Sequence, residues 1–262
     1  MHFTKYNGLG NDFIFLTGAT ALAVKDPAPL ARRLCDRYTG IGADGLVLLL
    51  PSQVADIRMR IINSDGSEAE MCGNASRCVP LHLAQTGQSG KQHVTLETLA
   101  GIIDTEIIDV QKNLVRVNMG AAKQIAPLTV QVEEKKFEGM AVSMGNPHFV
   151  ILVDNVESFP VEKWGPLLET HPAFAHKTNV EFVQVLDKNT VRMRVWERGA
   201  GITRACGTGS CATAVACITQ GLTDSSITVK LDGGELHIAW PDKKEIFMTG
   251  PAQKVFEGEI EL

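Results

Sequence analysis

The sequence has 262 residues, 44% of them hydrophobic, and its 25 Lys and Arg against 30 Asp and Glu give a net charge of −5. The charges are spread along the chain without a basic stripe, which argues against a nucleic-acid-binding surface. The longest apolar runs, such as GLVLLL (45–50), are far shorter than the ~20 residues a membrane-spanning helix needs. Polar residues interrupt the N-terminal segment where a signal peptide needs an apolar run, so we expect a cytoplasmic protein.

The first half of the chain reads as short strands, a Gly-rich turn and one apolar helix. The expected strands are FIFL (13–16), GLVLLL (45–50) and IRMRII (57–62). Residues 74–86, before Gly87, are typical of a helix that ends at a glycine. An interior proline costs a helix ~3 kcal/mol, so Pro80 predicts a kink or an early end.

The second half repeats this order after a Gly/Ala/Pro stretch at 119–128. The expected strands are FVILV (149–153), VEFVQVL (180–186) and VRMRVW (191–196). Residues 208–220, before Gly221, carry almost no charge on any face, which predicts a helix buried on all sides with sheet around it. The last residues, from Pro251 on, are expected to return to the first half as an extra strand.

The chain is a duplication. MCGNASRC (71–78) and ACGTGSC (205–211) place their cysteines 134 residues apart, and IRMRIIN (57–63) matches VRMRVWE (191–197) at the same offset. We therefore expect two pseudo-symmetric domains of the α/β class (α+β type), each a curled mixed sheet around a central buried helix. The expected boundaries are 1–118, joined by 251–262, and 119–250.

Six cysteines occur without any CxxC pair, and no histidine has a suitably spaced ligand partner, so we expect reduced thiols and no metal site. Four of the cysteines are expected to belong to the core: Cys35, Cys78, Cys211 and Cys217. Cys72 and Cys206 differ from these because they match across the duplication, each followed by a glycine and a helix start. They are the candidate catalytic residues.

A helix start presents unpaired N–H groups and partial positive charge, which should lower a cysteine pKa and can hold a carboxylate. Two thiols flanking one carbon suit a two-base racemisation, in which one thiolate removes the α-proton and the opposite thiol returns one. Each sulfur must then approach the carbon to about 3–3.5 Å. No cofactor is expected, since helix-start amides aimed at the substrate carboxylate can absorb the developing charge.

The motifs NGLGNDF (7–13), MCGNASRC, GNPH (145–148), TNVEF (178–182), ERGAG (197–201) and ACGTGSC closely resemble those of the diaminopimelate epimerase family. The resemblance implies a cofactor-independent enzyme that converts LL- to meso-diaminopimelate in lysine and peptidoglycan synthesis, and a homodimer is expected. It also implies that His148 and Glu197 tune the cysteine pKa values. The implied substrate contacts are Asn11, Asn63, Gly73, Asn74, Asn146, Asn179, Glu197, Arg198, Gly207 and Thr208.

This list suits a substrate that is zwitterionic at both ends. Arg198 can grip a distal carboxylate in bidentate fashion and Glu197 can accept from a distal ammonium. The asparagines could instead be turn formers, Asn146 before Pro147 in particular. The chain departs from the family pattern at Gly45, where some members carry Gln, around Ser76 and Pro80, and at Phe256, where some relatives have a Tyr linked to dimerisation.

Three alternatives compete with this interpretation. One is a racemase or epimerase of another amino acid on the same scaffold, which Arg198 and Asn63 disfavour because they imply a substrate with a second charged end. A thiol redox protein is less well supported, because the chain has no CxxC motif. A non-enzymatic amino-acid-binding module leaves the matched cysteines unexplained.

Overall fold

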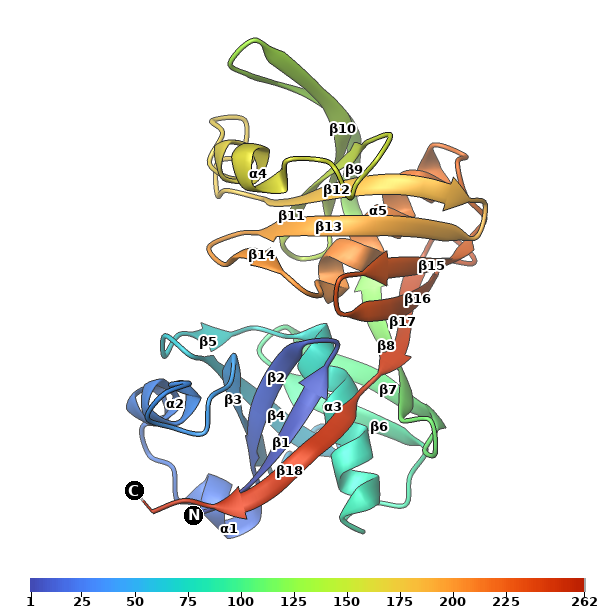
Figure 1. Ribbon diagram of the computed structural model, residues 1–262. Helices are drawn as coiled ribbons and strands as arrows, with labels where there is room; N and C mark the ends of the chain where they lie inside the picture. Colours follow the sequence, from blue (N-terminus) through green and yellow to red (C-terminus); the bar gives the residue numbers. More distant parts are fainter. Residues whose placement is uncertain (262) are drawn as a thin grey trace. The chain divides into compact units, whose positions relative to one another are not determined.

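A computed structural model describes residues 1–261 of the chain (Figure 1). The chain forms two compact units, one made of Met1–Val117 with Gly250–Leu262 and the other of Asn118–Thr249. It leaves the first unit within strand β8 (Leu114–Ala121) and returns within strand β17 (Glu245–Pro251). Both units combine helices with a mixed sheet, which confirms the expected α+β class.

The first unit wraps its sheet around one long helix, α3 (Gly73–Gln85), with two shorter helices, α1 (Gly18–Leu22) and α2 (Pro27–Cys35). Its last strand in sequence pairs antiparallel with its first. Besides β8, its strands are β1 (His2–Gly8), β2 (Asn11–Leu16), β3 (Gly45–Leu50), β4 (Ile57–Asn63), β5 (Glu68–Ala69), β6 (His93–Thr98), β7 (Gly101–Asp109) and β18 (Gln253–Glu259).

The second unit has the same plan around helix α5 (Gly207–Thr219), with α4 (Val161–Glu169) as its second helix. Besides β17, its strands are β9 (Lys123–Val132), β10 (Lys135–Ser143), β11 (Pro147–Leu152), β12 (Asn179–Asp187), β13 (Thr190–Glu197), β14 (Gly201–Thr203), β15 (Ser226–Leu231) and β16 (Gly234–Ala239).

The duplication extends to the register of the strands. The parallel pair β2–β3 places Phe13 opposite Gly45, and the parallel pair β11–β12 places His148 opposite Asn179. Each pair continues through an antiparallel strand, β4 or β13, which in turn pairs parallel with β6 or β15. Because the order and direction of pairing agree, a position in one unit has a defined counterpart in the other.

Burial explains the two central helices. In α5 every residue from Gly209 to Ile218 is buried, as expected for a helix that is apolar on all faces, and it packs against strands on several sides. Both helices end before a glycine with positive φ, Gly87 at +69° and Gly221 at +70°, as the sequence predicts. Of the two outcomes expected at Pro80, the early end does not occur, since α3 continues to Gln85. Buried apolar side chains on both sides of Pro80, such as Val79 and Leu81, favour the helix despite the lost hydrogen bond.

The shorter helices cover the outer faces of the sheets. Leu34 of α2 packs in a buried cluster with Ile14, Leu46 and Ile62 of the first unit. Trp164 and Leu168 of α4 pack in the corresponding cluster of the second. Each sheet therefore has a helix on both faces, which leaves the strand ends and the starts of α3 and α5 as places for polar side chains.

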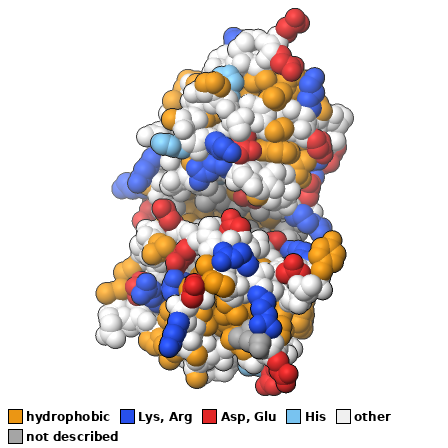
Figure 2. Space-filling model, turned by 90° about the vertical axis from the view of Figure 1, so that its left-hand side faces the viewer, with side chains coloured by type: hydrophobic (Ala, Val, Ile, Leu, Met, Phe, Trp, Pro, Cys, Tyr) orange, Lys and Arg blue, Asp and Glu red, His pale blue; other side chains and the backbone are white. Residues whose placement is uncertain are grey.

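The surface is mixed in charge. On the face shown in Figure 2, Lys and Arg side chains are interspersed with Asp and Glu, without a continuous patch of either sign among the residues drawn. No helix within residues 1–261 is long and apolar enough to cross a membrane.

Candidate active site

Cys72 stands at the N-cap of α3, where its backbone is extended (φ −140°, ψ 115°). Its Sγ lies 3.7 Å from Oδ1 of Asn11, which also accepts a hydrogen bond from Nδ2 of Asn74 at 3.1 Å. Asn11 begins β2 and Asn74 lies in the first turn of α3. The first unit thus brings a half-buried thiol together with two of the predicted amide groups.

Charged residues hold this cluster in place. Asp44 accepts from Nδ2 of Asn11 at 2.7 Å, which turns Oδ1 of that amide toward Cys72. Arg77, which is fully buried, donates to Oδ1 of Asn74 at 2.9 Å and to the carbonyl of Gly73 at 3.3 Å. Hydrogen bonds of a buried cation to the helix start fix the geometry in which Cys72 is presented.

Cys206 occupies the matching place in the second unit, at the N-cap of α5 (φ −125°, ψ 111°). Its Sγ accepts from the backbone N–H of Gly209 at 3.3 Å and lies 3.7 Å from Oγ1 of Thr208. Unlike Cys72 it is buried, with 4% of its surface exposed. The two thiols therefore lie in environments that differ in burial, although their positions in the fold are equivalent.

A chain of hydrogen bonds connects Thr208 to a carboxylate deep in the second unit. Nδ2 of Asn146 donates to Oγ1 of Thr208 at 3.3 Å, and Oδ1 of Asn146 lies 3.0 Å from Nε2 of His148. Nδ1 of His148 in turn lies 2.7 Å from Oε1 of Glu181, and both of these side chains are fully buried. The structure thus joins Asn146, His148 and Thr208, all predicted site residues, into one network.

Burial and negative charge act on the thiol of Cys206. Burial, followed by the nearby carboxylates of Glu197 and Glu181, raises the pKa of Cys206 well above its ordinary value, and the N–H of Gly209 offsets this only in part. Burial likewise raises the pKa of Glu197, whose carboxylate accepts from the hydroxyl of Thr203. The prediction that a helix start lowers the cysteine pKa is therefore wrong for Cys206, because burial outweighs the helix-start N–H groups.

Asn179 and Arg198 lie next to this network. Asn179 donates through Nδ2 to the carbonyl of Pro147 at 2.9 Å and accepts through Oδ1 from the backbone N–H of Arg198 at 3.0 Å. It therefore connects the GNPH and ERGAG segments. The guanidinium of Arg198 is exposed and donates to the carbonyl of His176 at 3.2 Å. A side chain held by one carbonyl can turn toward an anionic group.

Asn63 is placed differently from the other predicted contacts. It ends β4 opposite Gly45, and its Nδ2 donates to Oγ of Ser67 at 3.0 Å within the following turn. Its side chain is exposed and its present contact is that of a turn former. Because the chain has Gly at 45, the neighbouring strand contributes no side chain beside it.

Sequence reasoning missed four residues that position the two cysteines, namely Asp44, Arg77, Glu181 and Gly209. Glu181 carried the clearest signal, because it is a lone carboxylate within the apolar run VEFVQVL. Gly209 is required by close packing. A Cβ there would lie 2.7 Å from Oε1 of Glu181 and 3.1 Å from Sγ of Cys206.

The other four cysteines are buried, as expected of core residues: Cys35, Cys78, Cys211 and Cys217. Burial raises the pKa of Cys35, Cys78 and Cys217 to about 12. Within the described residues, no group of three or more His, Cys, Asp or Glu side chains is arranged to hold a metal ion.

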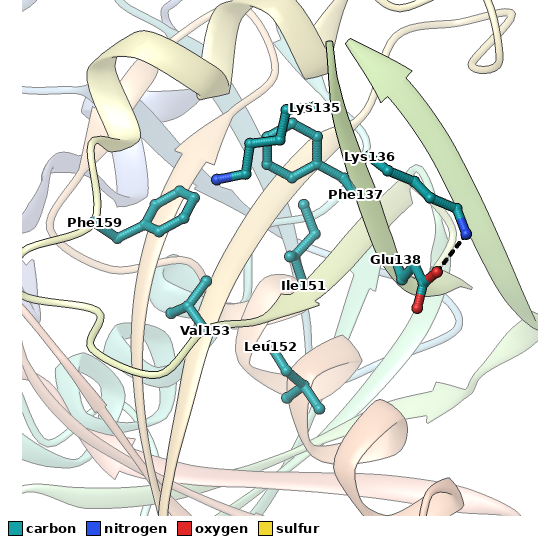
Figure 3. Close-up of a pocket in the computed structure, with 8 residues that line it drawn as sticks. All are labelled: Lys135, Lys136, Phe137, Glu138, Ile151, Leu152, Val153 and Phe159. Atoms are coloured by element: carbon teal, nitrogen blue, oxygen red, sulfur yellow. Dashed lines mark hydrogen bonds and ion pairs between the residues drawn. The ribbon is translucent and has the colours of Figure 1, made fainter.

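A surface hollow of about 280 Å³ lies elsewhere in the second unit, between β10, β11 and Phe159 (Figure 3). Its walls combine apolar side chains with those of Lys135, Lys136 and Glu138. The ammonium of Lys135 lies about 5 Å from the ring centres of Phe137, Phe159 and Trp164. None of its eight lining residues is a predicted site residue. The hollow is therefore separate from the candidate active site.

Comparison with solved structures supports the fold. A phenazine biosynthesis protein of the PhzF family from Bacillus anthracis superposes with a TM-score of 0.79 at 18% identity, over 100% of this chain and 99% of the other. A probable proline racemase from Agrobacterium radiobacter gives a TM-score of 0.74 at 17% identity, over 100% of this chain and 93% of the other. At these identities the likeness shows a common fold.

Comparison of sequences goes further. The chain is 48% identical to a diaminopimelate epimerase of Acetivibrio thermocellus, over 100% of this chain and 99% of the relative. It is 50% identical to one of Carboxydothermus hydrogenoformans, over 100% of both chains. The sequence model described as diaminopimelate epimerase matches residues 3–125 and 140–255. The chain belongs to the diaminopimelate epimerase family.

Proposed function

We propose that this protein interconverts LL- and meso-2,6-diaminopimelate without a cofactor, as a step in lysine and peptidoglycan synthesis. Membership of the family and near-complete coverage of relatives that carry this name support the proposal. The observation that carries it is the repeated arrangement of one thiol at the start of a buried helix in each unit, with amide or hydroxyl groups beside it.

In the proposed reaction, Cys72 and Cys206 act on opposite faces of one α-carbon. One thiolate takes the proton, so that a Cα–H bond breaks and an S–H bond forms, and the electron pair passes into the adjacent carboxylate. The opposite thiol then gives its proton to the other face of the carbon. The helix-start backbone around Gly73, Asn74, Gly207 and Thr208 is the proposed site for that carboxylate, because fixed N–H dipoles stabilise charge where it develops.

In this proposal Cys206 carries its proton before substrate binds, because burial and the nearby carboxylates of Glu197 and Glu181 raise its pKa. A neutral thiol is the form needed to return a proton. In the reverse direction the same residue must become the base, which requires a change in its surroundings when substrate binds. Glu197 and His148 are the proposed pKa-tuning pair. An ammonium group of the substrate beside Glu197 would offset the negative charge that now holds Cys206 neutral.

The distal end of the substrate is the proposed partner of Arg198 and Glu197. Diaminopimelate carries a second carboxylate and a second ammonium, for which a guanidinium and a carboxylate are the matching groups. Asn11, Asn63, Asn146 and Asn179 supply the remaining amide contacts in this proposal. Of these, Asn63 must exchange its present bond to Ser67 for one to the substrate.

We also propose that the protein acts in the cytoplasm as a homodimer. Phe256 on β18 is 44% exposed and stacks edge-on against Phe3 at 5.8 Å, so an aromatic ring is available at this position for a partner chain. Sedimentation at micromolar concentration tests the dimer. A monomer at that concentration would refute it.

The activity is tested by incubating the protein with LL-diaminopimelate in D2O and analysing the product by chiral chromatography and mass spectrometry. The proposal predicts meso-diaminopimelate with one deuterium at the inverted carbon. Alanine and proline, offered separately, should exchange their α-protons far more slowly. Equal exchange of alanine or proline would favour a generic racemase. An absence of exchange with all three substrates would favour a redox protein or a binding module.

A further inference from the structure

The second unit buries an ionisable pair that the proposed reaction does not use directly. His148 and Glu181 have no exposed side-chain surface, and Nδ1 of His148 lies 2.7 Å from Oε1 of Glu181. Oε2 of Glu181 has no hydrogen-bond partner within the described residues. A buried carboxylate with one unsatisfied oxygen is costly, so the pair requires a reason beyond packing.

The duplication places apolar side chains at the two equivalent positions of the first unit. His148 faces Asn179 in the parallel pair β11–β12, as Phe13 faces Gly45 in β2–β3. Glu181 follows Asn179 by two residues, and its counterpart is Val47. Phe13 and Val47 are both buried, with 3% and 0% exposure. The first unit therefore has the same strand arrangement with two apolar side chains where the second unit has an acid and an imidazole.

Energetics point the same way. Replacing a buried ion pair by apolar residues is often neutral, or stabilises a protein by about 1–4 kcal/mol. The pair is also coupled to the start of α5. Oε1 of Glu181 lies so close to Gly209 that a Cβ there would be at 2.7 Å, and the N–H of Gly209 is the donor to Sγ of Cys206. Glu181 therefore lies against both His148 and the start of α5.

We propose that Glu181 is a positioning residue for the epimerisation, an inference that rests on the proposed function. It anchors the ring of His148, and through His148 the amide of Asn146 and the hydroxyl of Thr208, which lies 3.7 Å from Sγ of Cys206. Glu181 does not touch the reacting atoms. It fixes the orientation of groups that do, and its charge helps to keep the thiol of Cys206 protonated.

The test compares three variants of the full chain. Glu181→Gln keeps the shape but removes the charge. His148→Phe combined with Glu181→Val installs the pair found in the first unit. Thr213→Val is the matched control, because Thr213 is a fully buried polar residue of α5 whose hydroxyl contacts Sδ of Met193 and lies outside the chain of hydrogen bonds. Thermal unfolding monitors folding, and turnover in D2O gives kcat and KM.

We expect Glu181→Gln to remain folded and to lose about 10- to 100-fold in kcat with a smaller change in KM, since displaced catalytic groups cost rate. Alkylation of Cys206 by iodoacetamide at fixed pH, followed by peptide mass spectrometry, should become faster than in the unmodified protein. The reason is that this variant lacks the carboxylate of Glu181, one of the two that favour the neutral thiol of Cys206. The double variant should fold at least as stably as the unmodified protein and be inactive, while Thr213→Val should keep its turnover.

Normal kcat and normal alkylation in Glu181→Gln would overturn the inference. So would an unfolded double variant, because the pair would then serve the fold. A purely structural role would lower the folded fraction without opposite changes in turnover and alkylation. If the unmodified protein fails to act on diaminopimelate, the proposed function fails. In that case the alkylation rates still show whether the charge of Glu181 affects the reactivity of the Cys206 thiol.

Discussion

The close packing at the start of α5 makes Gly209→Ala a sensitive probe of the site. The new methyl group would lie 2.7 Å from Oε1 of Glu181 and 3.1 Å from Sγ of Cys206. The first distance is shorter than real Cβ contacts allow, and the carboxylate cannot simply turn away, because Oε1 is held by His148 and Glu181 is fully buried. Either Glu181 or the thiol must move.

Two opposing effects determine how Gly209→Ala changes the free energy of unfolding. Alanine in a helix is favoured over glycine by about 1 kcal/mol, so the substitution would stabilise an open site. Overpacking a tight core costs about 1–3 kcal/mol. We therefore expect a net loss of up to about 2 kcal/mol in the free energy of unfolding. Activity should suffer more, because a displacement of about 1 Å near reacting atoms can cost 100-fold in rate.

Urea unfolding measures the first effect and turnover in D2O the second. Gly90→Ala is the control, since a Cβ at Gly90 meets no atom within 4 Å. Its stability should change by less than about 0.5 kcal/mol and its activity should not change. A Gly209→Ala protein with greater stability and full activity would show that Glu181 and Cys206 are not packed against this helix start as described.

Three further predictions concern other parts of the molecule. Arg198→Lys keeps a positive charge but loses the planar guanidinium, so kcat/KM for diaminopimelate should fall about 10-fold or more. Unchanged steady-state kinetics would show that Arg198 does not bind the distal carboxylate of the substrate. Activity should survive EDTA and hydroxylamine, and its loss on chelation with recovery on adding a metal would contradict the assignment of the carboxylate site to backbone amides. Burial is the main cause that lowers the pKa of His82 to about 4 from an ordinary 6.5, so the fold favours the neutral ring. Stability should therefore fall by about 3 kcal/mol as pH drops from 6.5 through 4, and His82→Leu should abolish that part of the pH dependence in urea unfolding. An identical pH dependence in both proteins would refute this assignment.

Much of the fold could be predicted from the sequence because the chain contains the same plan twice. The offset of 134 residues between Cys72 and Cys206 reappears in the register, where Gly45 and Asn179 hold equivalent places in parallel strand pairs. Helix ends were predictable from Gly87 and Gly221, since a positive φ suits glycine. Pro80 does not end α3 because helix propensity is a local quantity, whereas burial on all sides of α3 is not.

The site was predictable as a set of residues but not as an electrostatic environment. Motifs identify Asn11, Asn146 and Thr208, and the structure joins them to the two cysteines in separate units. The raised pKa of Cys206 depends on burial and on Glu181, which is 25 residues away in sequence. The sequence marks Glu181 as exceptional in two ways, as a lone carboxylate in the apolar run VEFVQVL and as the counterpart of Val47, but neither feature predicts that it lies close to Cys206.

The central claim is that two thiols serve the two faces of one carbon. The most direct test measures turnover of LL-diaminopimelate in D2O by Cys72→Ala and by Cys206→Ala, with Cys217→Ala as a control, because Cys217 is a buried core residue of α5. Circular dichroism establishes that each variant is folded. The account predicts that both site variants are inactive in epimerisation and that the control is active. Near-normal turnover by either site variant would contradict the two-thiol mechanism.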